Sequence, residues 1–410
     1  MNHWVIYIDN DSEKKNFIQL FEKGKLPASL KEFEQNKGSL YSQFTLEKLI
    51  EEEDKHDHKI ISSKDQTLET MSSGEQKKAL LYHLLEKKLD YIILDNPFDN
   101  LDIGFQEELK SILQKYSTTI SFIQIASRKV DTLSFINNYG KLVKDRFEEI
   151  SNAKIIETPT PDPFRSGSIP KPLETISVLQ NPLISFKNVT ISYGNKTILN
   201  TINWTVNRGD FWELTGANGS GKSTILSMIT GDNPKAFGQD IYLFGIKKGS
   251  GESVWDIKRK MGYYSPAMTN KFKGRHTVEH MLISGLTDSV GLYTIPSEMQ
   301  KRIIREWLVI LNFQEIKDTY FNELSTGKQR LVMTARAMVK HPPLLILDEP
   351  TTGMDDTSAA LLVALVNKIA RETDTAIIFV SHRKEPNLEP KSVYKLLKSS
   401  TGSIGVNTTI

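Results

Sequence analysis

Short, continuous apolar runs recur along the chain, and each ends in a polar residue. Tyr91–Asp95, Leu344–Asp348 and Ala376–Ser381 are of this kind, and amphipathic stretches rich in Ala and Leu lie between such runs. Apolar runs of this length, without strict alternation, are typical of strands that are buried on both faces of a sheet. The pattern therefore predicts α/β domains, each with a mostly parallel sheet between layers of helices.

The same order of segments occurs twice. Met71–Gln76, with the sequence Met-Ser-Ser-Gly-Glu-Gln, corresponds to Leu324–Gln329, with the sequence Leu-Ser-Thr-Gly-Lys-Gln. In each copy an apolar strand follows and ends in an aspartate, Asp95 or Asp348, which lies 24 positions after the first residue of the motif. Several matches in register indicate a tandem duplication.

Residues 151–182 separate the two copies and are rich in proline. Proline at this density blocks helices and sheet ladders and favours extended backbone, so we expect a semi-rigid linker. The linker divides the chain into a first domain at 1–150 and a second at 183–398. A polar tail at 399–410 is expected to be frayed.

The composition of the chain excludes several classes of functional site. The 410 residues include 39% hydrophobic and 25% charged side chains, the net charge is +2, and cysteine is absent. Disulfides, thiolate metal sites and a cysteine nucleophile are thereby excluded, and a reducing cytoplasm suits the chain. The first apolar stretch, Trp4–Ile8, is too short for a secretory signal, and no run reaches the roughly 18 residues that span a bilayer. We expect a cytoplasmic protein, with any place at the inner face of the plasma membrane provided by a partner.

A glycine-rich segment fits the G-x-x-x-x-G-K-[ST] pattern. It lies between a predicted strand, Gly209–Leu214, and a predicted helix, Ser223–Thr230. Such glycines let backbone N–H groups point at phosphates, and the helix N-terminus favours negative charge. With both flanking elements in place, a turn that binds nothing is the weaker interpretation. The predicted phosphate-binding residues are Gly216, Ala217, Asn218, Gly219, Ser220, Gly221, Lys222, Ser223 and Thr224.

Two carboxylates and a histidine follow predicted strands of the second copy. Asp348 and Glu349 come at the carboxyl end of a buried strand, where open α/β sheets bind ligands. We expect Asp348 and Ser223 to hold Mg²⁺ and Glu349 to orient the attacking water. His382 follows a later strand and is expected at the γ-phosphate, with Lys222 at the β- and γ-phosphates; a packed histidine is the alternative.

Together, Leu324–Gln329 and the loop, strand and histidine spacing resemble the ATP-binding cassette (ABC) ATPases over residues 183–398. The resemblance implies two tandem P-loop nucleotide-binding domains, each with a helical subdomain, that bind and hydrolyse Mg-ATP. It also places Tyr193 against adenine. The segment 230–258 further resembles the molybdate-type ModF group of tandem ABC ATPases, which implies transport through a separate membrane permease.

The first copy keeps the motif but has lost the phosphate loop. Ile8–Asn16 has no glycine and carries three acidic residues that would repel phosphate, with Lys15 at the place of the former loop lysine. Asn96 stands where Glu349 stands in the second copy, and Arg128 replaces the histidine. The first domain is also shorter, so we expect it to be truncated and unable to hydrolyse ATP.

The resemblance implies a function for the motif Met71–Gln76, which the first copy retains. In a head-to-tail pair of ABC domains, the Ser-x-Gly signature of one domain meets the γ-phosphate held by the other. Ser72, Gly74 and Gln76 are therefore predicted to complete the ATP site of the second domain, in a pseudo-dimer within one chain. A decayed domain that is kept for packing is the alternative.

The biological role stays open. The family usually has a glutamine that senses Mg²⁺ and contacts the permease, where this chain has Pro266. The departure puts coupling to a permease in doubt and favours a soluble ATPase that acts on a ribosome, nucleic acid or protein. A nucleotide-gated module without turnover is a third interpretation, which the intact Glu349 argues against.

Two charged segments suggest further sites. Residues 51–58 include His56 and His58 beside Asp57, which could bind a metal, although a solvated loop is favoured. Lysines and arginines between 247 and 275 could bind RNA or anionic lipid, although a solvated surface is again favoured.

Overall fold

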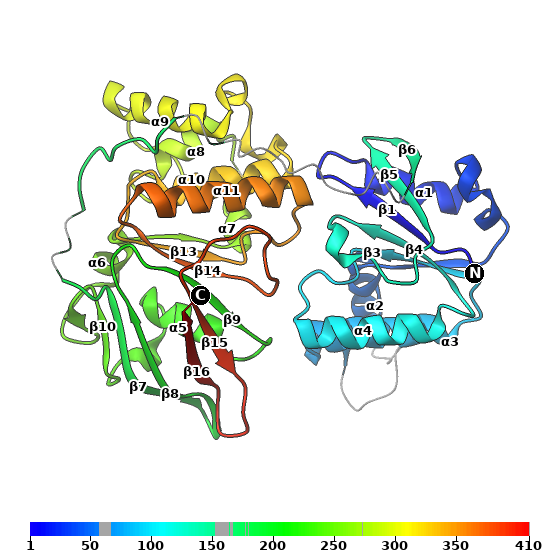
Figure 1. The fold of residues 1–410 in the computed structure, drawn as a ribbon, viewed down its shortest axis with the longest axis horizontal. Coiled ribbons are helices and arrows are strands. Elements are labelled where there is room, and N and C mark those ends of the chain that lie inside the picture. Colours follow the sequence, from blue (N-terminus) through cyan, green and yellow to red (C-terminus); the bar gives the residue numbers. More distant parts are fainter. Residues whose placement is uncertain are drawn as a thin grey trace. The chain divides into compact units, whose positions relative to one another are not determined.

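The structure is a computed structural model, and it describes residues 1–56, 67–151, 164, 167–176, 178, 180–272 and 274–409. The chain divides into two compact units (Figure 1). Unit 1 comprises Met1–Pro159 and Gly353–Thr357, and unit 2 comprises Thr160–Thr352 and Ser358–Ile410. The domain boundaries expected from the sequence stay predictions.

Unit 1 is built on a sheet with the strand order β2-β3-β4-β1-β5-β6, in which β6 alone pairs antiparallel among the described strands. Because successive side chains of a strand point to opposite faces, Val5 and Ile92 join one core cluster while Ile6 and Ile93 join another. Helices α3 and α4 cover the first face, and α1 covers the second. The elements are β1 (Trp4–Ile8), α1 (Lys14–Lys23), η1 (Ala28–Phe33), β2 (Gly38–Tyr41), α2 (Gln43–His56), η2 (Leu68–Thr70), α3 (Ser73–Glu86), β3 (Tyr91–Asp95), α4 (Ile103–Tyr116), β4 (Ser121–Ala126), η3 (Lys129–Asp131), β5 (Asn138–Val143) and β6 (Arg146–Ile150).

Unit 2 has a main sheet with the order β12-β13-β14-β9-β15-β16 and a second, antiparallel sheet with the order β11-β10-β7-β8. Helix α5 packs between the two sheets, since its side chains and those of both sheets form one buried cluster. The strands are β7 (Ile184–Tyr193), β8 (Lys196–Val206), β9 (Phe211–Gly216), β10 (Ile241–Leu243), β11 (Ile246–Lys247), β12 (Met261–Tyr264), β13 (Leu344–Asp348), β14 (Ala376–Val380), β15 (Ser392–Leu397) and β16 (Ile404–Thr409). The helices are α5 (Lys222–Ile229), η5 (Pro234–Ala236), α6 (Val254–Arg259), α7 (Pro266–Thr269), α8 (Val278–Ser284), α9 (Glu298–Leu311), η6 (Gln314–Ile316), η7 (Phe321–Glu323), α10 (Thr326–Met338) and α11 (Asp356–Glu372).

The main sheets of the two units correspond strand for strand. In both, the strand that ends in the aspartate has the same neighbours and the same register. The signature helices also keep equivalent contacts: the Gln76 amide donates to the carbonyl of Leu68 at 2.8 Å, and the Gln329 amide donates to the carbonyl of Phe321 at 3.0 Å. These shared contacts support the duplication that the sequence predicts.

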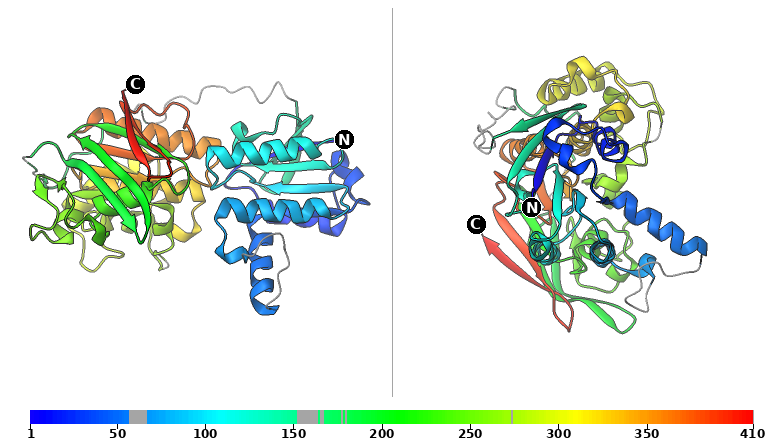
Figure 2. Two further views of the ribbon diagram at one scale, coloured as in Figure 1. Left: turned by 90° about the horizontal axis from the view of Figure 1, so that it is seen from below. Right: turned by 90° about the vertical axis from the view of Figure 1, so that its right-hand side faces the viewer.

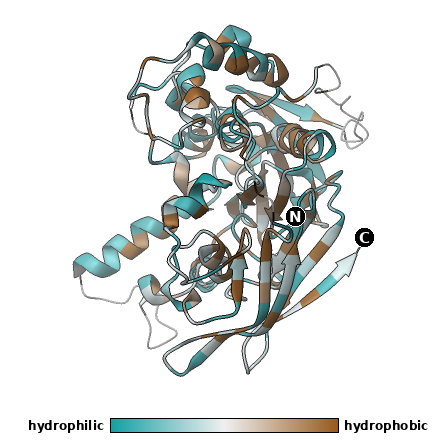
Figure 3. Ribbon diagram, turned by 90° about the vertical axis from the view of Figure 1, so that its left-hand side faces the viewer, coloured by the Kyte–Doolittle hydropathy of each residue, from teal (hydrophilic) through white to brown (hydrophobic). Residues whose placement is uncertain are grey.

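The units differ outside this shared sheet. Within the described residues, unit 1 has no counterpart of the antiparallel sheet β11-β10-β7-β8. Helix α2 follows β2 in the place where unit 2 has α7, α8 and α9. It projects from the body of unit 1 (Figure 2) and is mostly hydrophilic (Figure 3). The truncation of the first copy therefore affects its helical region and its first strands.

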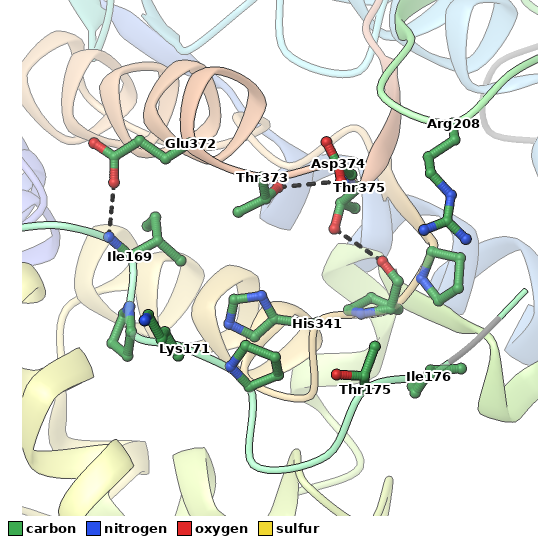
Figure 4. A pocket seen from close by; sticks show the side chains of 14 residues that line it. Ile169, Lys171, Thr175, Ile176, Arg208, His341, Glu372, Thr373, Asp374 and Thr375 are labelled. Carbon is green, nitrogen blue, oxygen red and sulfur yellow. Dashed lines mark hydrogen bonds between the residues drawn. The ribbon is translucent and has the colours of Figure 1, made fainter.

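Two expectations about the ends of unit 2 need correction. The tail is not frayed, because Ile404–Thr409 forms β16, which pairs with β15 over six positions. The later part of the predicted linker packs on unit 2: the Ile169 amide donates to a carboxylate oxygen of Glu372 at 2.7 Å. With His341 and Arg208, this stretch lines a pocket of about 250 Å³ at the amino ends of the strands (Figure 4).

Candidate nucleotide-binding site

The predicted phosphate loop connects β9 to α5, as the sequence indicates. Its glycines have conformations that side chains rarely adopt, with φ of 150° at Gly216 and 97° at Gly221. A Cβ at Gly221 would lie 2.5 Å from a methyl group of Leu199, so glycine is also required sterically. Because Gly221 precedes Lys222, the first residue of α5, the loop delivers the chain to a helix N-terminus.

The charged side chains of the site contact one another around His382. The Nε2 atom of His382 bonds to a carboxylate oxygen of Glu349, and its Nδ1 atom lies 3.4 Å from the Lys222 ammonium. Lys222 also donates to the carbonyls of Gly216 at 2.7 Å and Ala217 at 3.3 Å. The ammonium thus lies against the loop that is expected to hold phosphate.

Glu349 is held ionised. Burial opposes this, but the hydrogen bond from His382 and the nearby charges of His382 and Lys222 lower the pKa of the Glu349 carboxyl below its usual value. The backbone of Glu349 is in the left-handed region, with a φ of 52°. A carboxylate that is deprotonated near neutral pH can accept a hydrogen bond from the attacking water and orient it, while its lowered pKa makes it a weaker base than a free glutamate.

Asp348 lies beside it at the end of β13. Burial and the charge of Glu349 raise the pKa of Asp348, and the hydroxyl of Tyr263 donates to its Oδ2 atom at 3.2 Å. Asp348 and Ser223 offer a carboxylate and a hydroxyl oxygen, the kinds of ligand that Mg²⁺ takes beside phosphates and water. The donor set fits the predicted cation.

Lys222, Ser223, Glu349 and His382 line one pocket of unit 2, with a volume of about 520 Å³. Tyr193 is 46% exposed, and its hydroxyl accepts a hydrogen bond from the Asn233 amide at 3.0 Å. Of the residues that the second copy was predicted to supply, Gly216, Ala217, Ser220 and Asp348 do not line the pocket: the first two hold Lys222, and Ser220 is fully buried. The lining consists of Tyr193, Lys196, Ile198, Asn218, Gly219, Gly221, Lys222, Ser223, Thr224, Glu349 and His382.

Sequence reasoning missed Lys196 and Ile198, which line the pocket, and Tyr263, which contacts Asp348. Lys196 and Ile198 follow Tyr193 across the turn between β7 and β8, so the predicted adenine contact could have pointed to them. Tyr263 lies three positions before Pro266, in the segment where the family usually has a glutamine. Its contact with Asp348 could not be predicted there, because it depends on the pairing of β12 with β13.

The corresponding region of unit 1 keeps a smaller pocket, of about 160 Å³, which Lys14, Asp95 and Asn96 help to line. The lysine that reaches the strand aspartate is Lys14, whose ammonium lies 2.9 Å from Asp95, whereas the predicted Lys15 is exposed. The amide oxygen of Asn96 accepts from the backbone of Ser127 at 2.9 Å. The residual cation and carboxylate therefore neutralise each other.

The two signatures differ in their helix caps. In unit 1 the Ser72 hydroxyl donates to a carboxylate oxygen of Glu75 at 2.8 Å and caps α3 in a capping box. In unit 2, Ser325 precedes α10 without a side-chain cap among the described residues. A phosphate contact by Ser72 would require its hydroxyl to turn away from Glu75, and Gln76 has a structural contact of its own. Both contacts to nucleotide stay predictions.

The basic region after the phosphate loop is partly neutralised. Lys258 lies 2.7 Å from Asp232, and the buried Lys248 lies 3.0 Å from Glu252. These pairs reduce the positive charge that the region offers to RNA or anionic lipid, and the interpretation as solvated surface stays a prediction. Lys273 lies outside the described residues. So do Asp57, His58 and the side-chain surroundings of His56, the residues of the possible metal site.

Among the described residues, the protein has no helix with both the length and the apolar character that crossing a membrane requires.

Comparison with known proteins identifies the family. The ABC transporter family matches residues 199–352. The chain is 35% identical over 334 residues to the ABC transporter ATP-binding protein ModF of Escherichia coli K12, which covers 78% of this chain and 68% of that protein. An uncharacterized ABC transporter ATP-binding protein of Schizosaccharomyces pombe is 32% identical over 329 residues, covering 78% and 66%. The chain thus spans about two thirds of the length of these relatives.

Among solved structures, the ABCE1 proteins are similar in fold over 100% of this chain. A model of ribosome-bound archaeal Pelota and ABCE1 has a TM-score of 0.64 at 15% identity and is covered to 75%. A crystal structure of archaeal ribosome recycling factor aABCE1 with stalk protein aP1 has a TM-score of 0.63 at 13% identity and is covered to 86%. These structural similarities show the fold. The match to the ABC transporter family and the 35% identity to ModF show that the chain belongs to the ABC ATP-binding protein family and is an ATP hydrolase with the P-loop fold.

Proposed function

We propose that the chain binds and hydrolyses Mg-ATP at one composite site. The observation that carries the proposal is the pocket of unit 2, where the lysine of a phosphate loop, a histidine and an ionised glutamate meet. In unit 1 the corresponding lysine and aspartate are paired with each other. The intact site thus belongs to unit 2, and the signature of unit 1, Ser72 and Gly74, is proposed to complete it.

Each group has a role in in-line attack of water on the γ-phosphate. Lys222 turns from the loop carbonyls to the phosphates, and the loop amides and the α5 N-terminus stabilise their negative charge. Glu349 orients the water and accepts its proton, while His382 fixes the carboxylate. Asp348 and Ser223 hold Mg²⁺, which supplies positive charge to the transferred phosphoryl group. Tyr193 stacks on adenine.

The experiment is a count of nucleotides. Equilibrium dialysis of the full chain with Mg²⁺ and a slowly hydrolysed ATP analogue should give one bound nucleotide per chain. Lys222→Ala should abolish that binding, and Lys14→Ala, the matched change in unit 1, should leave it intact. Two bound nucleotides, or equal losses in the two variants, would refute the single site.

We propose that this hydrolysis energises transport through a separate membrane permease. The name of the ModF relative, an ABC transporter ATP-binding protein, supports this proposal. The chain would then lie at the inner face of the plasma membrane. Pro266 favours a second candidate, a soluble ATPase that acts on a ribosome, nucleic acid or protein, because it offers no polar side chain at the predicted permease contact. Purification of the tagged chain from native membranes separates the two: a co-purifying permease supports transport, and ribosomes or RNA support the second role.

A further inference from the structure

Two adjacent tyrosines on β12 have different partners. Tyr263 and Tyr264 point to opposite faces of the main sheet because side chains alternate along a strand. The Tyr263 hydroxyl donates to Oδ2 of Asp348 at 3.2 Å. The Tyr264 hydroxyl, which is fully buried, accepts from Nη1 of Arg330 on the signature helix α10 at 2.8 Å. One tyrosine thus contacts the proposed metal ligand, and the other contacts the framework.

Unit 1 provides an internal comparison. Tyr263 is paired in register with Ile346, two positions before the strand aspartate Asp348, and Leu40 is paired in the same way with Ile93, two positions before Asp95. Leu40 therefore occupies the position of Tyr263 in the unit whose site is lost.

The neighbouring position has not changed. Tyr41 corresponds to Tyr264, and its hydroxyl donates to the backbone carbonyl of Lys77 at 3.1 Å. Lys77 stands on α3 at the position that Arg330 holds on α10, six positions after the first residue of the signature motif. The framework tyrosine is thus present in both units, whereas the tyrosine at the aspartate is present where the phosphate loop is intact.

The chemistry of the two aspartates explains why a phenol suits this position. Asp95 is neutralised by Lys14, and a carboxylate paired with an ammonium has less charge to offer a cation. The neutral hydroxyl of Tyr263 fixes one oxygen of Asp348 without cancelling its charge. A phenol has an ordinary pKa of about 10, so the hydroxyl keeps its proton and is a donor at neutral pH.

We propose that Tyr263 is a positioning residue for the cation of Mg-ATP: it holds Oδ2 of Asp348 so that the other carboxylate oxygen faces the metal. The inference rests on the proposed role of Asp348. Tyr263 supplies from β12 a polar contact to the metal site in a segment where Pro266 has no polar side chain. Outer-shell hydrogen bonds of this kind orient a ligand, and their loss typically costs about 10- to 100-fold in metal affinity.

The test measures Mg²⁺ binding rather than turnover. Tyr263→Phe is made in a Glu349→Gln background, in which hydrolysis is slow, and calorimetry at saturating ATP gives the dissociation constant for Mg²⁺. We expect this constant to rise by about 10- to 100-fold, while the affinity for metal-free ATP and the melting temperature change little. Tyr264→Phe is the matched control, since it removes the same atom from the adjacent residue; it should lower the melting temperature and leave Mg²⁺ binding unchanged.

Asp348→Asn in the same background distinguishes a wrong role for Tyr263 from a wrong role for Asp348. If Asp348→Asn weakens Mg²⁺ binding and Tyr263→Phe does not, the positioning role is wrong and the proposed site stands. If Asp348→Asn also leaves Mg²⁺ binding unchanged, the proposed metal ligand is wrong and the positioning role fails with it. Equal effects of Tyr263→Phe and Tyr264→Phe would likewise overturn the inference.

Discussion

Replacing Glu349 with glutamine is the sharpest test of the proposed chemistry. Glutamine has the same length, and its amide oxygen can accept the hydrogen bond that His382 Nε2 makes to the carboxylate. The backbone at this position keeps its conformation, because the glutamine side chain has the same branching. The variant should therefore fold and bind ATP with a dissociation constant within about threefold of the original, since Lys222 and the loop amides still hold the phosphates.

We expect Glu349→Gln to lower the rate of the chemical step. The pKa of Glu349 lies below its usual value, so the side chain is ionised at neutral pH and ready to accept a proton. An amide cannot do so, and removing a general base costs about 10²- to 10⁴-fold in rate. At 1.36 kcal/mol for each factor of ten, this corresponds to about 3 to 5 kcal/mol of transition-state stabilisation. Phosphate release in the steady state gives kcat, and binding of a fluorescent ATP analogue gives the affinity.

Glu213→Gln is a suitable control, because it makes the same chemical change on β9, outside the pocket lining. It should keep nearly full turnover. If Glu349→Gln retains more than half of the original kcat, or if both variants lose activity equally, Glu349 does not activate the water.

Three further changes test other parts of the structure. Tyr193→Ala should weaken the binding of ATP and of GTP by a similar factor, roughly tenfold, because stacking is tolerant of base identity. If calorimetry shows no loss of affinity for either nucleotide, Tyr193 does not contact the base. Ser72→Ala should slow ATP hydrolysis by about 10- to 100-fold, the value of a hydrogen bond to a charged phosphate, and Ser325→Ala should change it little, so equal losses contradict the assignment. Gly262→Ala places a Cβ 2.1 Å from the carbonyl oxygen of Ala337; overpacking of this kind costs about 1 to 3 kcal/mol, and an unchanged urea midpoint would show that the backbone yields instead.

Much of the fold could be predicted because the chemistry is encoded locally. The phosphate loop needs glycines at fixed spacing, and its flanking strand and helix follow from the pattern around it. The strands Tyr91–Asp95 and Leu344–Asp348 have the predicted bounds, since a strand buried on both faces must be apolar throughout. Motifs of this kind also led to the family, which the comparisons show.

The elements that were missed depend on pairing rather than on pattern. Strand β16 is largely exposed and polar, so its hydrogen bonds to β15 hold it although it buries little apolar surface. The predicted Lys15 was wrong for a similar reason: a count along the chain cannot tell which lysine of a helix turn reaches across to Asp95. Tyr263 was missed because its contact with Asp348 crosses from one strand to the next.

The left-handed backbone after the strand aspartate has a consequence for the history of the chain. Asn96 and Glu349 have φ of 43° and 52°, and each backbone amide donates to the neighbouring strand, to Ile125 and to Val380. A residue other than glycine pays about 1 to 2 kcal/mol for this conformation, and asparagine tolerates it better than glutamate. Once selection for hydrolysis relaxes, replacement by asparagine stabilises the domain, and the return to glutamate is uphill. The backbone conformation therefore favours asparagine over glutamate at this position. A domain that has lost the catalytic glutamate in this way is expected to stay without ATP hydrolysis.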